Sequence, residues 1–334
     1  MACVIFSAAC RREGGRVLEV AYVSGVQVNL RDRVAAAYEK TGLVKNGDRV
    51  EVLDHDRRFA RVRTAGGQVG WMEQRFLVSQ DVFDQLQKLT ADNQNVPVQA
   101  QGVTRNDTNL HVEAGRDAQH LYQISTGEKL ALLKRATAEK PGASAPAPRP
   151  AAASERKETT PATLRPVIED WWLVRDSQGR VGWVLARMVD VNAPLDIAQY
   201  AEGQRIVAFF VLDQVQDGTN RVAQYLTALS EPKDGLPFDF NQIRVFTWNV
   251  KRHRYETAYR ERLSGVLPIT VSEETFEKEG ALPVFVIRVR DGDGNISERK
   301  YRLSTPIVRR VYAPGEQPTH SPRKTEVRKS RPKN

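Results

Sequence analysis

Few residues of this chain combine the type and the spacing that covalent or metal chemistry requires. Cys3 and Cys10 are the only cysteines, so the chain beyond residue 10 has no thiol for nucleophilic catalysis or zinc binding. No His-Glu-x-x-His, Gly-x-Ser-x-Gly or phosphate-binding glycine loop occurs. We therefore predict that the chain is not an enzyme and holds no metal ion or cofactor. The histidines, far apart in the sequence, are His55, His111, His120, His253 and His320.

Two further segments resemble binding patterns but fit strands and turns better. Residues 291–297 begin like a calcium-binding loop, yet Ile296 takes the place of the required glycine and Arg302 that of the bidentate glutamate. We predict a hairpin turn there. The basic and aromatic stretch 248–262 would suit stacking on nucleic acid, but glutamates dilute its charge and alternation favours a solvated strand face. Nucleic acid is therefore not an expected partner.

An internal repeat is the strongest pattern in the chain. Val-Gly-Trp ends two segments, at 69–71 and at 181–183, and earlier landmarks match in the same order. Gly47 corresponds to Gly127, but the second copy has 32 more residues between this glycine and its Val-Gly-Trp. Because repetition indicates that one structural unit recurs, we predict two modules of one kind.

Apolar and polar residues alternate between the landmarks. The alternation at 49–52 and at 59–63 is typical of half-buried strands. Turns at 45–48 and 64–68 contain the glycines and asparagine that tight hairpins need. The connections are too short for a crossover helix, so we predict antiparallel strands.

The order of these landmarks resembles the bacterial SH3 (SH3b) domain. Val-Asn-Leu-Arg at 28–31, a Gly-Asp turn before an alternating strand, an aromatic residue opening the next strand, and Gly-Trp at 70–71 all match. The usual Arg-x-Gly-Pro turn of the family is replaced at 31–34. The resemblance implies two small β-barrels that bind ligands at their surfaces.

Aromatic side chains are the candidate ligand contacts, because their rigid faces suit peptides and the apolar faces of sugars. Trp171 and Trp172 are adjacent in an expected strand, so we expect one of them to point outward and the second module to be the better binder. Trp71 and Trp183 could instead belong to the barrel cores. The candidate residues are Tyr38, Phe59, Trp71, Tyr122, Trp171, Trp172 and Trp183.

The remaining segments complete an all-β organisation. Apolar residues at helical spacing after residue 79 predict a linker helix that packs on a neighbouring module. Proline and alanine dominate the insertion, which predicts disorder. Seven short strands after residue 200, with separate strands at 254–260 and 266–271 and the last at 297–303, predict a β-sandwich or barrel. The expected division is an N-terminal segment 1–19, a first SH3-like barrel 20–78, a linker helix 79–96, a second barrel 97–191 with a disordered insertion 134–170, a β-domain 200–314 and a basic disordered tail 315–334.

Charge and the N-terminus suggest a location. The net charge is +9, in part from the tail, and suits polyanions without selecting one. Ser-Ala-Ala-Cys at 7–10 resembles the end of a bacterial lipoprotein signal, which implies lipidation at Cys10; an ordinary apolar N-terminus is the alternative.

We predict a non-catalytic binding or scaffold protein of the cell envelope, periplasmic or at the surface, whose SH3b modules bind peptidoglycan peptides or envelope proteins. One alternative is a cytosolic adaptor or nucleic-acid-binding protein that acts through its basic surfaces. A weaker alternative is an enzyme with its active site in 200–314.

Overall fold

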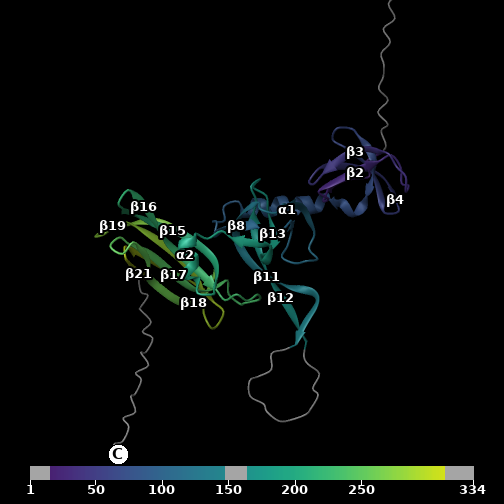
Figure 1. Ribbon diagram of the computed structural model, residues 1–334. Coiled ribbons are helices and arrows are strands. Elements are labelled where there is room, and N and C mark those ends of the chain that lie inside the picture. Colours follow the sequence, from purple (N-terminus) through teal and green to yellow (C-terminus); the bar gives the residue numbers. More distant parts are fainter. Residues whose placement is uncertain (1–15, 147–163, 313–334) are drawn as a thin grey trace, which may run out of the picture.

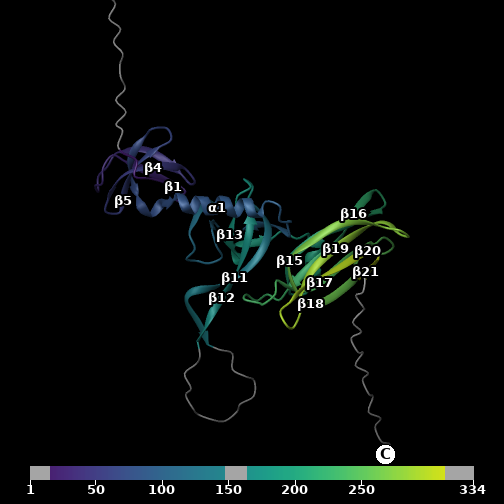
Figure 2. The ribbon, with the colours of Figure 1, turned by 180° about the vertical axis from the view of Figure 1, so that it is seen from behind.

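A computed structural model describes residues 16–146 and 164–312 of the chain. Regular structure within these ranges is almost entirely β, in three antiparallel sheets of seven strands each, which confirms the predicted all-β class. Figures 1 and 2 show the sheets following one another in chain order, with helix α1 (Gln80–Asn93) between the first and the second. No helix in the described ranges combines the length and the apolar character needed to cross a membrane. Cys10 and the tail 315–334 lie outside the described residues.

The first sheet forms a small barrel around its own apolar core. Its strand order is β3-β2-β6-β5-β4-β1-β7. Val50, Val52 and Val62 point into the core and are almost fully buried, as their period-two spacing predicts. Gly70 allows close packing, because a Cβ there would lie 2.7 Å from Leu30 Cβ. The elements are β1 (Glu19–Val23), β2 (Gln27–Arg31), β3 (Lys40–Lys45), β4 (Arg49–Asp56), β5 (Phe59–Thr64), β6 (Val69–Glu73), the 3₁₀ turn η1 (Gln74–Phe76) and β7 (Leu77–Ser79).

The second sheet repeats this order strand for strand, as β10-β9-β13-β12-β11-β8-β14. Gly182 repeats the close approach of Gly70, since a Cβ there would lie 2.8 Å from Leu110 Cβ. The register also repeats: Arg31 pairs with Trp71 in the first sheet, and His111 pairs with Trp183 in the second. The elements are β8 (Ala100–Thr104), β9 (Thr108–His111), β10 (His120–Ile124), β11 (Lys129–Pro146), β12 (Leu164–Arg175), β13 (Val181–Leu185), η2 (Ala186–Met188) and β14 (Val189–Val191).

The ends of the insertion at 134–170 are ordered. Strands β11 and β12 continue past the barrel as one long hairpin and pair along most of their length. The prediction of disorder is therefore wrong for 134–146 and 164–170. The two arms satisfy each other's backbone hydrogen bonds, and Arg135 and Asp170 attach them to the C-terminal domain. The rest of the insertion, 147–163, lies outside the described residues.

Helix α1 packs against both barrels. Val82 and Leu86 are buried in the large cluster that includes the core of the second barrel. Phe83 stacks on Tyr22 of β1, with ring centroids 4.1 Å apart. On the other side, Val181 N–H donates to Thr90 Oγ1 at 3.0 Å. The apolar stripe that marks this helix in the sequence thus fixes the first barrel against the second.

A turn of the first barrel also contacts the second barrel directly. Asn46, between β3 and β4, donates from Nδ2 to Ser24 O at 2.9 Å and to Leu121 O at 2.8 Å. The backbone N–H of Gln123 donates to Asn46 Oδ1 at 3.1 Å. One amide side chain therefore holds the turn of its own barrel and the β10 backbone of the other.

The third sheet runs up and down in chain order, from β15 to β21. Two strands expected separately at 254–260 and 266–271 form the single strand β18, and the last strand, β21, was not predicted. The elements are α2 (Leu195–Ala198), η3 (Gln199–Ala201), β15 (Arg205–Asp217), β16 (Asn220–Ser230), β17 (Phe240–Asn249), β18 (Arg254–Phe276), β19 (Gly280–Arg290), β20 (Ile296–Ser304) and β21 (Ile307–Val311).

Strand β18 divides the third sheet into two layers. Its first part pairs with β17 and its second part with β19, and the change falls at Gly265. A Cβ at Gly265 would lie 2.1 Å from the Phe240 ring, so only glycine fits under that ring. Ile243 of one layer and Phe285 and Ile287 of the other belong to one buried cluster. A bent strand shared by both layers is how a continuous sheet becomes a sandwich.

The second barrel and the C-terminal domain share an interior. Gln99, which is fully buried, receives a hydrogen bond from Ile269 N–H at its Oε1 (2.7 Å) and donates from Nε2 to Ile269 O (3.2 Å). Its backbone carbonyl accepts from Phe209 N–H at 3.1 Å. One buried cluster contains apolar residues of both bodies, so they pack as a single unit.

Candidate functional site

The aromatic residues proposed as ligand contacts in the first barrel gather around an arginine. Arg31, at the end of β2, lies across the sheet from Trp71 of β6. Its guanidinium carbon is 4.1 Å from the Tyr38 ring centroid and 5.2 Å from that of Phe59. Its Nη2 atom is 3.7 Å from Glu73 Oε1. We call Arg31, Tyr38, Phe59, Trp71 and Glu73 the first-barrel surface.

The first-barrel surface is open. Tyr38 is 40% exposed, Trp71 is half-buried, and Phe59 forms the floor. Trp71 belongs to none of the apolar clusters found among the described residues. The Arg31–Glu73 pair is long and partly exposed, and Glu73 Oε2 also lies 2.9 Å from Nε of Arg75, whose side chain is 71% exposed. Exposed pairs of this kind are weak, so a ligand can compete for both groups. Stacking on Tyr38 meanwhile holds the guanidinium in place.

The corresponding surface of the second barrel is closed. His111 takes the position of Arg31, and its Nδ1 contacts Ala118 O at 2.9 Å. Its ring centroid lies 5.1 Å from that of His120 and 5.2 Å from that of Trp171. Burial lowers the pKa of His111, an effect that the Ala118 carbonyl opposes and nearby His120 reinforces. Strand pairing brings together two histidines that the sequence separates.

Trp171 and Trp172 are both buried, with 2% and 5% exposed, so the expectation that one points outward is wrong. The two side chains do face opposite sides of β12, but both sides are covered. Trp172 joins the apolar cluster of the barrel interior. On the other side, Glu169 lies two residues before Trp171 and is held by Arg116 through bonds of 2.6 and 2.9 Å. The same Arg116 bonds lower the pKa of Glu169.

The other two candidates of the second barrel take part in contacts between structural units. Trp183 packs with Leu89 of α1 against a buried cluster on the outer face of β13. Tyr122 is 8% exposed and lies under the guanidinium of Arg180, whose carbon is 4.3 Å from the ring centroid. Its ring also faces Gly47 in the turn of the first barrel. Burial raises the pKa of Tyr122.

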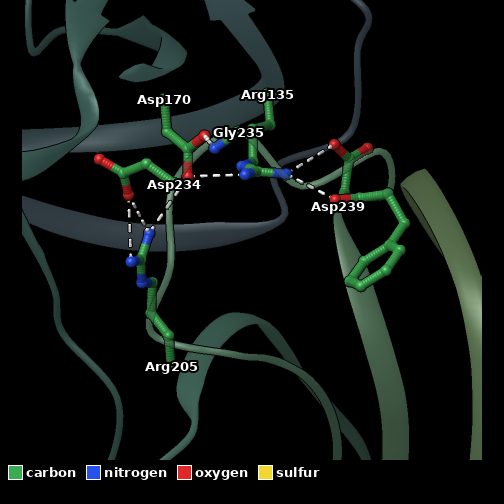
Figure 3. A network of polar contacts seen from close by, with 7 residues as sticks. Arg135, Asp170, Arg205, Asp234, Gly235 and Asp239 are labelled. Carbon is green, nitrogen blue, oxygen red and sulfur yellow. Dashed lines mark hydrogen bonds and ion pairs between the residues drawn. The ribbon is translucent and has the colours of Figure 1, made fainter. Parts of the chain in front are cut away.

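A network of charges centred on the buried Arg135 and Asp170 lies where the hairpin of the second barrel meets the C-terminal domain (Figure 3). Asp170 of β12, whose side chain is fully buried, lies 2.6 Å from Arg135 Nη2 and 3.2 Å from Arg205 Nη1. Burial raises the pKa of Asp239, against the Leu267 amide and Arg135, which lower it. The remaining contacts are Gly235 N–H to Asp170 (2.9 Å), Arg135 to Asp239 (3.5 Å) and Arg205 to Asp234 (3.1 Å).

The described residues contain no group of three or more histidine, cysteine or acidic side chains able to hold a metal ion. Residues 291–295 form the predicted hairpin turn between β19 and β20, and Ile296 begins β20. Asp291 Oδ1 accepts from the backbone N–H groups of Asp293 (3.0 Å) and Asn295 (2.8 Å), so this carboxylate organises the turn.

Comparisons with known proteins support a bacterial SH3 domain in the first barrel. The family described as "Bacterial SH3 domain" matches residues 25–78. No curated protein sequence is similar enough to the chain to be a match.

Solved structures similar to the chain include NlpC2 and NlpC1 from Trichomonas vaginalis and an NlpC/P60 family protein from Bacillus cereus ATCC 10987. Their identities are 8%, 9% and 11%, and their TM-scores are 0.18, 0.17 and 0.23, in that order. The matches cover 84%, 88% and 86% of this chain and 96%, 92% and 95% of the other chains. TM-scores this low assign neither a fold nor an activity to this chain.

The prediction that the chain is not an enzyme is withdrawn, since the similar solved structures carry the names NlpC2, NlpC1 and NlpC/P60 family protein. The exclusion rested on the lack of cysteine beyond residue 10 and of familiar catalytic motifs. The absence of these residues and motifs excludes only the kinds of catalysis that need them. It does not exclude catalysis by other groups of residues.

Sequence reasoning missed the charged members of these sites. Arg31 directly follows the repeated Asn-Leu landmark, and Glu73 lies two residues after Trp71 on the same strand face. The positions of Arg31 and Glu73 on the expected strands could therefore have placed them beside the aromatic candidates. Arg135 and Asp239 are distant in the sequence, and no local pattern links them.

Proposed function

We propose that this protein binds peptidoglycan peptides or proteins of the bacterial cell envelope through its first-barrel surface. The observation that carries this proposal is that Tyr38 and Trp71 remain accessible beside the Arg31–Glu73 ion pair, which is itself partly exposed. The bacterial SH3 match at 25–78 fits an envelope location.

The chemistry of the first-barrel surface suits a peptide that carries both charges. Arg31 can donate two parallel hydrogen bonds to a carboxylate, and Glu73 can accept from an amine. The faces of Tyr38 and Trp71 give an apolar support for aliphatic side chains or for the apolar face of a sugar ring. Peptidoglycan peptides combine carboxylates, amines and short aliphatic groups.

We also propose that the second barrel is a diverged copy of the same domain. It shares the strand order and the glycine and tryptophan positions of the first barrel, while its aromatic residues are used in packing. Lipidation at Cys10, which lies outside the described residues, would retain the protein at a membrane. Labelling of cells with a fatty-acid analogue, compared between the natural chain and Cys10→Ser, tests that part independently.

Cosedimentation of the full chain with purified sacculi tests the binding proposal. Trp71→Ala and Tyr38→Ala should each weaken binding about tenfold, as truncated aromatic contacts in binding sites commonly do. Tyr312→Ala is the matched control, because Tyr312 is also 40% exposed and has the Arg310 guanidinium carbon 4.9 Å from its ring centroid. Equal loss in all three variants, or no loss in the first two, contradicts the proposal.

A further inference from the structure

A second concave site lies beside the buried charge network. A cavity of ≈ 620 Å³ opens between the second barrel, the connecting residues 193–204 and strands β15 and β16. Trp172, Val189 and Val207 form an apolar wall, and Leu195, 87% exposed, lies at the cavity. The volume falls within the range of about 300–1,000 Å³ that is typical of small-molecule and peptide-end sites.

The acidic groups around this cavity are already paired. Asp170 is held by two arginines and a backbone N–H, as shown in Figure 3. Asp190 accepts from Arg105. The other two, Asp234 and Asp239, contact Arg205 and Arg135 respectively. A cationic ligand would therefore have to displace existing ion pairs.

The cavity has hydrogen-bond donors without a close acceptor. Arg187, in η2, has a 59% exposed side chain, and its nearest carboxylate oxygen, in Glu169, is 3.8 Å away. Ser230, at the end of β16, is 3% exposed, and its hydroxyl has no hydrogen-bond partner among the described residues. Buried polar atoms almost always have a partner, so this hydroxyl is able to bond to a polar group placed in the cavity.

The remaining polar groups at the cavity suit amides better than a plain hydrocarbon. Arg105 and Asp190 form an ion pair in which both side chains are more than half exposed. Asp234 and Arg205 are also partly exposed. The guanidinium and carboxylate groups of these pairs have further donor and acceptor positions that a peptide backbone can use and the chain of a fatty acid cannot.

We propose that this cavity binds the C-terminal end of a short aliphatic peptide. Arg187 and the Ser230 hydroxyl hold the terminal carboxylate, and the last side chain packs on Trp172 and Val189. This site is separate from the first-barrel surface, and the proposal does not depend on the function assigned to that surface.

Calorimetric titration of the full chain tests the proposal. The probes are acetyl-Ala-Ala, acetyl-Ala-Val and acetyl-Ala-Leu, each with a free carboxylate and each as the C-terminal amide. At least one carboxylate should bind with a dissociation constant below about 1 mM, and its amide should bind at least about tenfold more weakly, because a charge-assisted pair is lost.

Two matched variants complete the test. Arg187→Ala should weaken binding of the carboxylate about tenfold and leave binding of the amide unchanged. Arg75→Ala is the control, since Arg75 holds the same place in η1 of the first barrel. Equal binding of acid and amide, no binding of any probe near 1 mM, or unchanged affinity in Arg187→Ala would each overturn the proposal.

Discussion

The two barrels have the same strand order and opposite surroundings. In the first, the strand face that begins with Phe59 continues with Arg61 and Arg63, and the aromatic surface above it is open. In the second, the matching face begins with Trp171 and continues with Leu173, which is buried in the cluster that Trp183 and Leu89 of α1 pack against. The same strand order thus leaves an open aromatic surface in one barrel and an internal contact surface in the other.

The insertion accounts for much of this difference. In the first barrel, strands β4 and β5 end at a short turn that includes Arg57 and Arg58. In the second barrel the equivalent strands extend as a hairpin, which supplies Arg135 and Asp170 to the contact with the C-terminal domain. The longer hairpin thus joins the second barrel to the C-terminal domain. The aromatic surface of the first barrel stays open.

Removal of the buried carboxylate should have the largest effect. Asp170→Ala leaves Arg135, whose side chain is 5% exposed, without its closest partner, so we expect the free energy of unfolding to fall by about 3–5 kcal/mol. Arg58→Ala, at the corresponding exposed position of the first barrel, should change it by less than about 0.5 kcal/mol. Urea unfolding of both variants measures the difference. A small loss for Asp170→Ala would show that the hairpin does not hold the domains together.

The two repeated tryptophans should separate stability from binding. Trp183→Ala should lower the free energy of unfolding by about 3 kcal/mol, because Trp183 packs with α1, and should leave sacculus binding intact. Trp71→Ala should cost about 1 kcal/mol or less and weaken binding. Thermal unfolding and cosedimentation, performed on the same samples, test this. Equal behaviour of the two variants would remove the functional contrast between the barrels.

The direct hydrogen bonds described between the barrels depend on one amide side chain. Asn46→Ala removes the acceptor of Gln123 N–H and the donor to Leu121 O, with an expected cost of about 1–3 kcal/mol. Hydrogen exchange at the Gln123 amide should accelerate. Thr126→Ala, at the corresponding turn of the second barrel, removes only an exposed contact to Asp107 and should leave that amide protected. Unchanged exchange in Asn46→Ala would show that these hydrogen bonds do not hold β10 against the first barrel.

The smallest expected effect is a dependence on pH confined to the second barrel. Burial lowers the pKa of His111 and of His120, so below about pH 6.5 the unfolded chain binds more protons than the folded one. Stability is therefore greatest above that pH and falls as the pH drops. In the first barrel, Arg31 and Lys40 take the positions of His111 and His120. Neither residue changes its charge near pH 6.5. Hydrogen exchange followed separately in each barrel should show that the second barrel loses stability in acid, and that the double variant His111→Asn/His120→Asn does not. Equal loss of stability in both barrels would contradict the pKa directions.

Local patterns were sufficient for much of the fold. Alternation located two strands of the first barrel and helical spacing located α1, because each pattern reports which side of a single element is apolar. The internal repeat then extended the strand prediction to the second barrel. Alternation could not show that both faces of β12 are covered, since Arg116, His111 and α1 come from other parts of the chain. It also divided β18 into two strands, because the bend at Gly265 interrupts the alternation and the pairing partners lie elsewhere.

The sequence by itself determined the repeat, the β class, the positions of the aromatic residues and the charge of the chain. Each of these depends on residue type and on spacing within one segment. Only the tertiary structure decided that Tyr38 and Trp71 stay accessible around Arg31, whereas Trp171 and Trp172 are enclosed. The physical reason is that exposure depends on what lies above a side chain, and in the second barrel the covering groups come from distant segments of the chain.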